Sequence, residues 1–244
     1  MCGIVGYVGH GQAVDLILPG LRRLEYRGYD SSGIASIPDV GESSLGEICV
    51  TKTSGRIDHL AAALEDAPTP GNIGIGHTRW ATHGPPTDIN AHPHFGGQGS
   101  VAVVHNGVIE NFRSLKAKLE SEGYAFTSAT DTEVIAHLID YELRALDPTI
   151  TWGMDRHGAL VSVVQAALCQ LQGTYGLAVL FRDWPEVIVA ARLGSPLVIG
   201  VGHGEHFLAS DGSPLVGHTD KIVYLADHEL AVITADSLRV IHRD

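Results

Sequence analysis

The last third of the chain is a series of short β-rich segments separated by residues that favour turns. Each segment is rich in branched and aromatic apolar residues and is shorter than an ordinary helix. The segments are Leu177–Phe181, Val187–Ala191, Leu197–Val201, Phe207–Ser210, Ile222–Leu225, Leu230–Thr234 and Leu238–Ile241. So many short strands in succession are typical of sheets with many antiparallel neighbours.

The rest of the chain combines further strands with helices. Short β-rich runs lie at Ile4–Gly9, Ser32–Ile37, Glu47–Thr53, Asn72–Thr78 and Ser100–His105. Helical spacing of apolar residues predicts helices at Gln12–Glu25, Arg56–Ala67, Asn111–Glu122, Thr130–Leu146 and Asp155–Leu171. Strands, then helices, then strands predict an α+β fold in which sheets pack against helices. With no linker or repeat in between, we expect one domain over residues 1–244.

Three local signals refine this expectation. Pro19-Gly20 should kink or split the first helix, because proline lacks the N–H and clashes one turn back. Pro38–Gly46 has no period and is predicted to be a loop, and Arg79–Gly99 is an irregular stretch whose length is typical of functional loops. Thr130 and Glu133 form a capping-box pattern for the helix that follows them.

Charge and cysteine content exclude several classes of protein. The 244 residues include 16 Lys and Arg against 28 Asp and Glu, and a net charge of −12 argues against nucleic-acid binding. Three cysteines are too few for a disulfide framework. No basic leader or apolar stretch long enough to span a membrane is present. We therefore expect a soluble cytoplasmic protein that binds neither membranes nor nucleic acids.

Cys2 is the first candidate for chemistry because of its position. Removal of the initiator Met, which is usual before a small residue, would leave a free α-amino group beside the Cys2 thiol. The reference pKa values of the two groups, ~7.7–8.0 and ~8.5, are close enough for them to share a proton near neutrality. An N-terminal amine can act as the base for its own side-chain nucleophile. From position alone, however, an accidental second residue is the commoner reading.

Three other sites bear groups that suit amino-acid chemistry. Arg79 could bind a carboxylate through its fork of donors, although a surface salt bridge is as common. The Asn106 amide and the Gly107 N–H could bind an oxyanion, although an Asn-Gly turn at a strand end is the usual reading. Asp131 lies in a helix N-terminus, where capping is the default role of an acidic residue.

Histidines are concentrated in the middle of the chain and raise the question of a metal. They are His77, His83, His92, His94 and His105. Apart from Asp88, no acidic or thiol ligand is spaced to complete a shell around them. We favour histidines that orient loops through hydrogen bonds to the backbone, and we predict no metal and no cofactor.

Six motifs occur in order and together resemble one enzyme family. They are Met1–Gly6, Glu25–Gly33, His77–Gly84, Asn90–His94, His105–Gly107 and Thr130–Glu133. They resemble the glutaminase domain of glucosamine-6-phosphate synthases, which are N-terminal-nucleophile amidotransferases. The resemblance covers essentially the whole chain. Amidotransferases that make asparagine or phosphoribosylamine share the opening Cys-Gly and the Asn-Gly, but are not expected to carry the second and third motifs together.

The resemblance implies hydrolysis of L-glutamine. Cys2 would attack the side-chain amide and form a γ-glutamyl thioester while its α-amine carries the proton. Asn106 and the Gly107 N–H would form the oxyanion hole. Arg79 would bind the α-carboxylate of glutamine, and Asp131 its α-ammonium group.

Three neighbours of Arg79 receive roles through the same resemblance. Thr82 would help to bind the α-carboxylate. Trp80 resembles the gate between the glutaminase site and an ammonia channel. His83 resembles a residue of the loop that closes over glutamine.

The resemblance also implies architecture and partners. The expected fold is the N-terminal-nucleophile hydrolase sandwich, four α/β-β/α layers built on two antiparallel sheets. Ammonia would pass to sugar-isomerase domains that bind fructose 6-phosphate. This sequence contains no counterpart of those domains. The full-length enzyme is expected to be a homodimer. A free-standing amidotransferase subunit serving another acceptor is the alternative, and a non-catalytic module that binds amino acids or metal on the same scaffold is a third hypothesis. Retention of Met1 would leave an inactive precursor.

Overall fold

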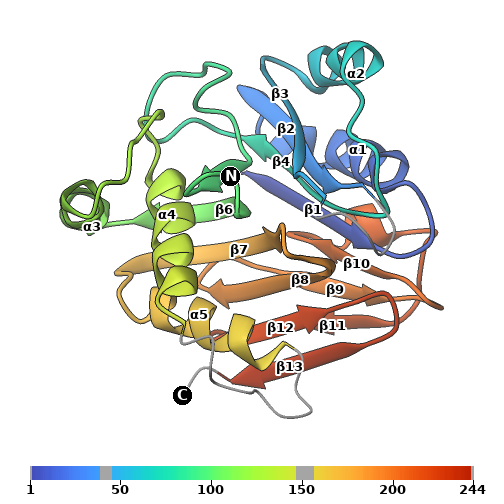
Figure 1. Cartoon of the computed structure of the whole chain (residues 1–244). Helices are drawn as coiled ribbons and strands as arrows, with labels where there is room; N and C mark the ends of the chain where they lie inside the picture. Colours follow the sequence, from blue (N-terminus) through green and yellow to red (C-terminus); the bar gives the residue numbers. More distant parts are fainter. Residues whose placement is uncertain (1, 39–45, 147–156, 243–244) are drawn as a thin grey trace.

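The strands of the chain form two antiparallel sheets that stack face to face, with helices on the outer face of each (Figure 1). This computed structural model describes residues 2–38, 46–146 and 157–242. The α+β architecture predicted from the sequence is confirmed, as is the four-layer sandwich that the resemblance implied.

The first sheet has seven strands in the order β11-β9-β10-β1-β4-β2-β3. Its central strand β1 pairs with β10 on one side and with β4 on the other. The strands are β1 (Gly3–Val8), β2 (Ser31–Ile37), β3 (Cys49–Ser54), β4 (Ile73–Arg79), β9 (Val198–Val201), β10 (His206–Ala209) and β11 (Ile222–Tyr224).

The second sheet has six strands in the order β13-β12-β8-β7-β6-β5. They are β5 (His94–Gly96), β6 (Val101–Ile109), β7 (Gly173–Phe181), β8 (Trp184–Leu193), β12 (Glu229–Ile233) and β13 (Leu238–His242). All seven segments predicted in the last third of the chain are therefore strands.

Helices cover the outer face of each sheet. The first sheet carries α1 (Ala13–Leu24) and α2 (Ile57–Asp66), and the second carries α3 (Phe112–Ser121), α4 (Asp131–Arg144) and α5 (Gly158–Leu168). Two short 3₁₀ turns, η1 (Glu25–Arg27) and η2 (Ser213–Leu215), complete the described elements.

Alternation along the strands fills three apolar layers. In β1, Ile4 and Val8 point between the sheets, whereas Val5 and Tyr7 point toward α1. Successive side chains of a strand face opposite sides, so one strand supplies two layers of core. The third layer packs α4 and α5 on the second sheet through residues such as Ile135.

Helix α1 contradicts the expected break at Pro19-Gly20, because it runs without interruption from Ala13 to Leu24. Pro19 is exposed, so water can solvate the carbonyl that its ring leaves unpaired. A Cβ at Gly20 would lie only 3.0 Å from a Val5 methyl, so glycine allows the helix to pack closely on β1. The stability gained by packing on the sheet outweighs the low helix propensity of Pro19 and Gly20.

Other boundaries differ locally. Strand β5 lies inside the stretch predicted to be irregular, and the predicted start of α5 at Asp155 falls outside the described residues, as does most of the predicted loop at Pro38–Gly46. Thr130 caps α4 by accepting from the Glu133 N–H, but the Glu133 carboxylate turns to the amides of Thr127 and Ser128. Only half of the predicted capping box forms.

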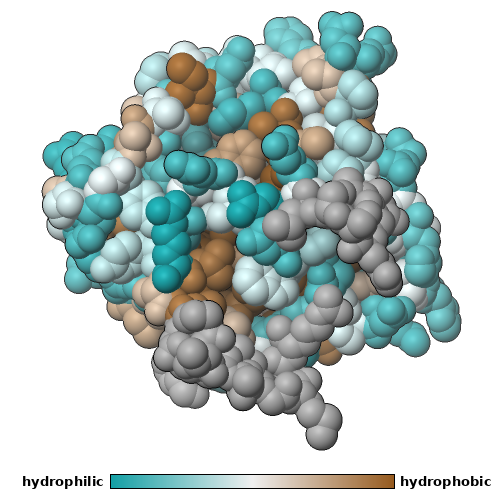
Figure 2. Space-filling view, viewed as in Figure 1, coloured by the Kyte–Doolittle hydropathy of each residue, from teal (hydrophilic) through white to brown (hydrophobic). Residues whose placement is uncertain are grey.

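The visible surface mixes polar and apolar residues. In the face drawn in Figure 2, hydrophobic residues occur as separate patches among hydrophilic ones. Among the described residues, no helix combines the length and the apolar character needed to cross a bilayer.

Candidate active site

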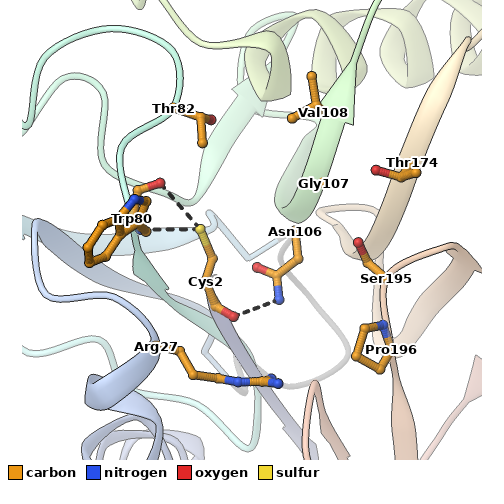
Figure 3. Close-up of a pocket in the computed structure, with 10 residues that line it drawn as sticks. All are labelled: Cys2, Arg27, Trp80, Thr82, Asn106, Gly107, Val108, Thr174, Ser195 and Pro196. Carbon is orange, nitrogen blue, oxygen red and sulfur yellow. Dashed lines mark hydrogen bonds between the residues drawn. The ribbon is translucent and has the colours of Figure 1, made fainter.

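Cys2 lies just before β1, where that strand meets the end of β4 (Figure 3). Its Sγ accepts a hydrogen bond from the Trp80 backbone N–H at 3.2 Å, and its thiol approaches the Trp80 carbonyl at 3.6 Å. Burial raises the pKa of the Cys2 thiol, while the Trp80 N–H and the Arg79 charge partly oppose this rise. The thiol is therefore positioned by backbone atoms at the end of a rigid strand.

Two pockets meet at Cys2. One extends toward Asn106, Ser195 and Pro196, and the other toward Arg79 and Asp131. The residues that line both pockets are Cys2, Trp80, Thr82 and Gly107. Seven of the eight residues predicted from sequence thus line these two pockets, although they come from four distant segments. The eighth, His83, packs its ring edge-on against Phe112, with 5.1 Å between ring centroids.

Arg79 is buried at the end of β4, and its guanidinium donates to backbone carbonyls of the loop that follows. Its acceptors are His83, Gly84 at 3.4 Å and Pro85 at 3.3 Å. Burial lowers its pKa, and the nearby negative charges of Asp131 and Asp30 oppose this. A buried guanidinium that has no carboxylate partner among the residues the structure describes suits an anionic ligand.

Asp131 begins α4 and is also buried. One of its carboxylate oxygens accepts from the Ile109 backbone N–H at 2.9 Å. Within residues 2–38, 46–146 and 157–242, neither Asp131 nor Arg79 takes part in an ion pair closer than 4.0 Å. The two opposite charges can therefore receive the two charges of an amino acid.

Asn106 and Gly107 lie inside β6, opposite Gly176 and Tyr175 of β7. The expectation that they end a strand is wrong, because β6 continues to Ile109 and pairing with β7 overrides the local turn preference of Asn-Gly. The Asn106 side-chain nitrogen donates to the Cys2 carbonyl at 3.1 Å. This bond places the amide beside the thiol (Figure 3).

Gly107 has a φ of +140°, a conformation that L side chains rarely adopt, and a Cβ there would lie 2.0 Å from the Thr174 carbonyl oxygen. We expect Gly107→Ala to lower the free energy of unfolding by at least the ~1–3 kcal/mol typical of such backbone strain. Glutamine hydrolysis should fall as well, because β6 would shift beside Cys2. Thermal unfolding measures the first effect, and Gly123→Ala is the control: Gly123 also has a positive φ, but a Cβ there meets no atom within 4 Å. Equal losses for both variants would contradict the steric argument.

Four of the five clustered histidines are buried against the site. His92 and His105 both contact the Thr132 hydroxyl, at 2.7 and 3.1 Å, and His94 contacts the Thr130 hydroxyl at 3.0 Å. These histidines form hydrogen bonds with side chains as well as the hydrogen bonds with backbone atoms that we expected from the sequence. No group of three or more ligand side chains suited to a metal occurs among the residues that the structure describes.

Two supporting residues were not singled out from the sequence. The Asp30 carboxylate accepts from the Ala81 N–H at 2.9 Å and so fixes the chain just after Trp80. Lys52 donates to the carbonyls of Ile89, Ala91 and Pro93, at 3.4, 2.9 and 3.3 Å, and burial lowers its pKa to about 8. Asp30 lies within a recognised motif, but nothing near Lys52 in the sequence signals its role.

Comparison with known proteins agrees with this geometry. Residues 77–216 match the family model of the glutamine amidotransferase domain. The chain is 49% identical to the glutamine–fructose-6-phosphate aminotransferase (isomerizing) of Pyrococcus horikoshii, over 97% of this chain and 37% of that protein. The protein of the same name from Bacteroides thetaiotaomicron is 48% identical over 96% of this chain and 36% of its own length. The chain thus spans little more than a third of these relatives.

Solved structures share the fold. The glutamine phosphoribosylpyrophosphate amidotransferase of B. subtilis superposes with a TM-score of 0.77 and 26% identity, over the whole of this chain and 49% of that one. A class-II glutamine aminotransferase domain protein from Silicibacter pomeroyi, 15% identical, shares the fold with a TM-score of 0.60 over the whole of both chains. The two-sheet sandwich holds a thiol near the amino terminus, beside two buried groups of opposite charge. Because the family model also matches more than half of the chain, the chain belongs to the glutamine amidotransferase family.

Proposed function

We propose that the chain hydrolyses L-glutamine to glutamate and ammonia through a thioester on Cys2. The observation that carries this proposal is the pocket that joins the Cys2 thiol to the Arg79 guanidinium and the Asp131 carboxylate. These two charges complement the α-carboxylate and α-ammonium groups of glutamine. The side-chain amide would then extend toward the sulfur.

The chemistry follows from the groups around the thiol. The Cys2 Sγ attacks the amide carbon, and the oxyanion that forms is stabilised by the Gly107 N–H and by the second hydrogen of the Asn106 amide nitrogen. Collapse of the tetrahedral intermediate expels ammonia and leaves the γ-glutamyl thioester, which water hydrolyses to glutamate. Once Met1 is removed, the free α-amine of Cys2 accepts the thiol proton and delivers it to the leaving amine.

Trp80, Thr82 and His83 support handling of substrate and product. Thr82 lines both pockets and can add a hydroxyl to the α-carboxylate site. Trp80 stands where the two pockets meet and packs edge-on against Tyr29, with 5.6 Å between centroids, so its side chain can gate the passage of ammonia. His83 belongs to the loop that would close over glutamine.

We further propose that the ammonia is transferred to fructose 6-phosphate, which sugar-isomerase domains of a longer enzyme would bind. We expect that enzyme to be homodimeric and cytoplasmic. The names of the relatives support this acceptor. The chain matches little more than a third of their length, which supports a longer enzyme. A free-standing amidotransferase subunit with another acceptor is the alternative. The deciding measurement is glutamate release from glutamine with and without fructose 6-phosphate, together with the mass of the native protein, which the proposal expects to be more than twice that of this chain.

Loss of either charge at the site should weaken glutamine binding. Arg79→Ala and Asp131→Ala each leave one buried charge of the substrate unpaired, and truncation of one partner in a buried charge pair costs about 2–5 kcal/mol. We therefore expect the KM for glutamine to rise steeply in both variants. Asparagine should be a poor substrate of the unchanged protein, because it is one methylene too short to reach from these charges to Cys2.

Asp58→Ala provides a matched control for these variants, since Asp58 is exposed, pairs with Arg22, and neither residue lines these two pockets. Steady-state kinetics of glutamate release measure all three proteins. A wild-type KM in either the Arg79 or the Asp131 variant would require a different role for that residue.

A further inference from the structure

His77 lies in β4 with its ring completely buried. Its Nε2 is 3.0 Å from the Asn106 side-chain oxygen and 3.1 Å from the His105 carbonyl oxygen. Both neighbours accept hydrogen bonds, so Nε2 must carry the hydrogen. Nδ1 has no hydrogen-bond partner within the described part of the chain, which suits the nitrogen that lacks a hydrogen. The ring is thus fixed as one tautomer.

The opposite end of the Asn106 amide gives the same orientation independently. The atom that faces the Cys2 carbonyl at 3.1 Å must be the nitrogen, because a carbonyl oxygen only accepts. A reversed amide would set two oxygens against each other at Cys2 and two N–H groups against each other at His77. The two contacts therefore select the same orientation, in which the amide nitrogen faces the nucleophile.

Burial also determines the charge state of this histidine. It lowers the pKa of His77 to about 3, so the ring stays neutral at the pH at which glutamine would be hydrolysed. His77 can therefore orient the amide throughout turnover without adding a second positive charge beside Arg79. The contact of its ring with a side chain that reaches Cys2 is the one with Asn106, which donates to the Cys2 carbonyl.

We infer that His77 is a positioning residue, whose Nε2–H holds the Asn106 amide with its nitrogen toward Cys2 and so preforms the oxyanion-binding site. This inference rests on the proposed glutaminase function. Without the His77 donor, only the Cys2 carbonyl still holds the amide nitrogen in place, and the amide can rotate and present its oxygen to the developing negative charge. The loss should resemble that of an oxyanion donor, which costs roughly 10²–10³-fold in kcat.

Two substitutions of His77 separate positioning from packing. His77→Leu removes the donor, and we expect kcat to fall by roughly 10²–10³-fold with little change in the KM for glutamine, because Arg79 and Asp131 still hold its charges. His77→Gln should restore most of kcat, because its amide nitrogen replaces Nε2 as donor. His77→Leu combined with Asn106→Ala should be no slower than Asn106→Ala alone, since His77 acts only through Asn106.

The contrary results are equally definite. If the losses of His77→Leu and Asn106→Ala multiply, or if the Gln variant is as slow as the Leu variant, the positioning role is wrong. If the Leu variant does not fold, ¹⁵N spectra of the histidine rings decide, with the His77 signal identified by its absence from the Gln variant. An Nδ1–H tautomer would overturn the inference. Full activity of Asn106→Ala would instead count against the oxyanion role in the proposed function, while the tautomer measurement would still test His77.

Discussion

Replacement of Cys2 by alanine is expected to abolish glutamate release from glutamine while the fold is retained. The thiol is the nucleophile that the proposal places at the junction of both pockets, and no other cysteine lines either of them. Loss of the nucleophile in a serine protease costs on the order of 10⁶-fold in kcat, and a comparable loss would be undetectable here. Cys2→Ser should be nearly as inactive, because a hydroxyl of much higher pKa cannot share its proton with an amine near pH 8.

The control for these variants is Cys169→Ala, which removes an exposed thiol and should leave turnover unchanged. Alanine and serine are small enough for Met1 still to be removed, so the variants differ from the parent only at the side chain. Coupled assays of glutamate formation and circular dichroism give activity and fold. Substantial turnover by a folded Cys2→Ala protein would end the nucleophile assignment.

An N-terminal extension is expected to have the second largest effect. When Met1 or a tag precedes Cys2, the Cys2 nitrogen becomes an amide with no basicity, and the thiol loses its proton acceptor. General-base assistance is worth typically ~10²–10⁴-fold, so the extended protein should be slower by at least that factor. The extra residue would also occupy space beside the nucleophile, which adds to the loss.

The pH dependence of activity tests whether the α-amine of Cys2 is the base. In the processed protein, activity should increase as pH rises through the titration of the α-amine, near ~7.7–8.0 unless the site shifts it, because only the neutral amine accepts the thiol proton. Intact-mass spectrometry gives the fraction of each preparation that begins at Cys2, and specific activity should follow that fraction. A C-terminal tag is the control. Full activity in an N-terminally extended preparation would refute the amine as base, while the family assignment would stand.

The sequence predicted the strands well, because the fold uses short apolar segments separated by clear turn residues. It failed where tertiary pairing opposes a local preference. Asn106-Gly107 has the composition of a turn, yet β7 pairs with both residues and extends β6. His94–Gly96 is too short to show any period, but it pairs with β6 and forms an edge strand. Such pairings depend on the neighbouring strand, which local sequence patterns do not report.

The candidate site could be predicted only through the resemblance. Cys2, Arg79, Asn106 and Asp131 were each ambiguous when taken alone, and no periodicity brings such distant positions together. The structure places them around two adjoining pockets. The supporting interactions of His77 and Lys52 could not be foreseen, because a buried histidine and a surface lysine look the same in sequence whether or not they hold a neighbour in place.

Under the proposed function, strand β6 sets the distance between the groups that hold the two ends of the substrate. In the proposed mechanism it supplies the Gly107 N–H for the reacting end of glutamine, and two residues further on its Ile109 N–H donates to Asp131, the proposed site for the amino end. Two residues of an antiparallel strand span roughly 6.8 Å, a length fixed by covalent geometry and ladder hydrogen bonds. Selection for the length of the amino acid is then built into the sheet itself.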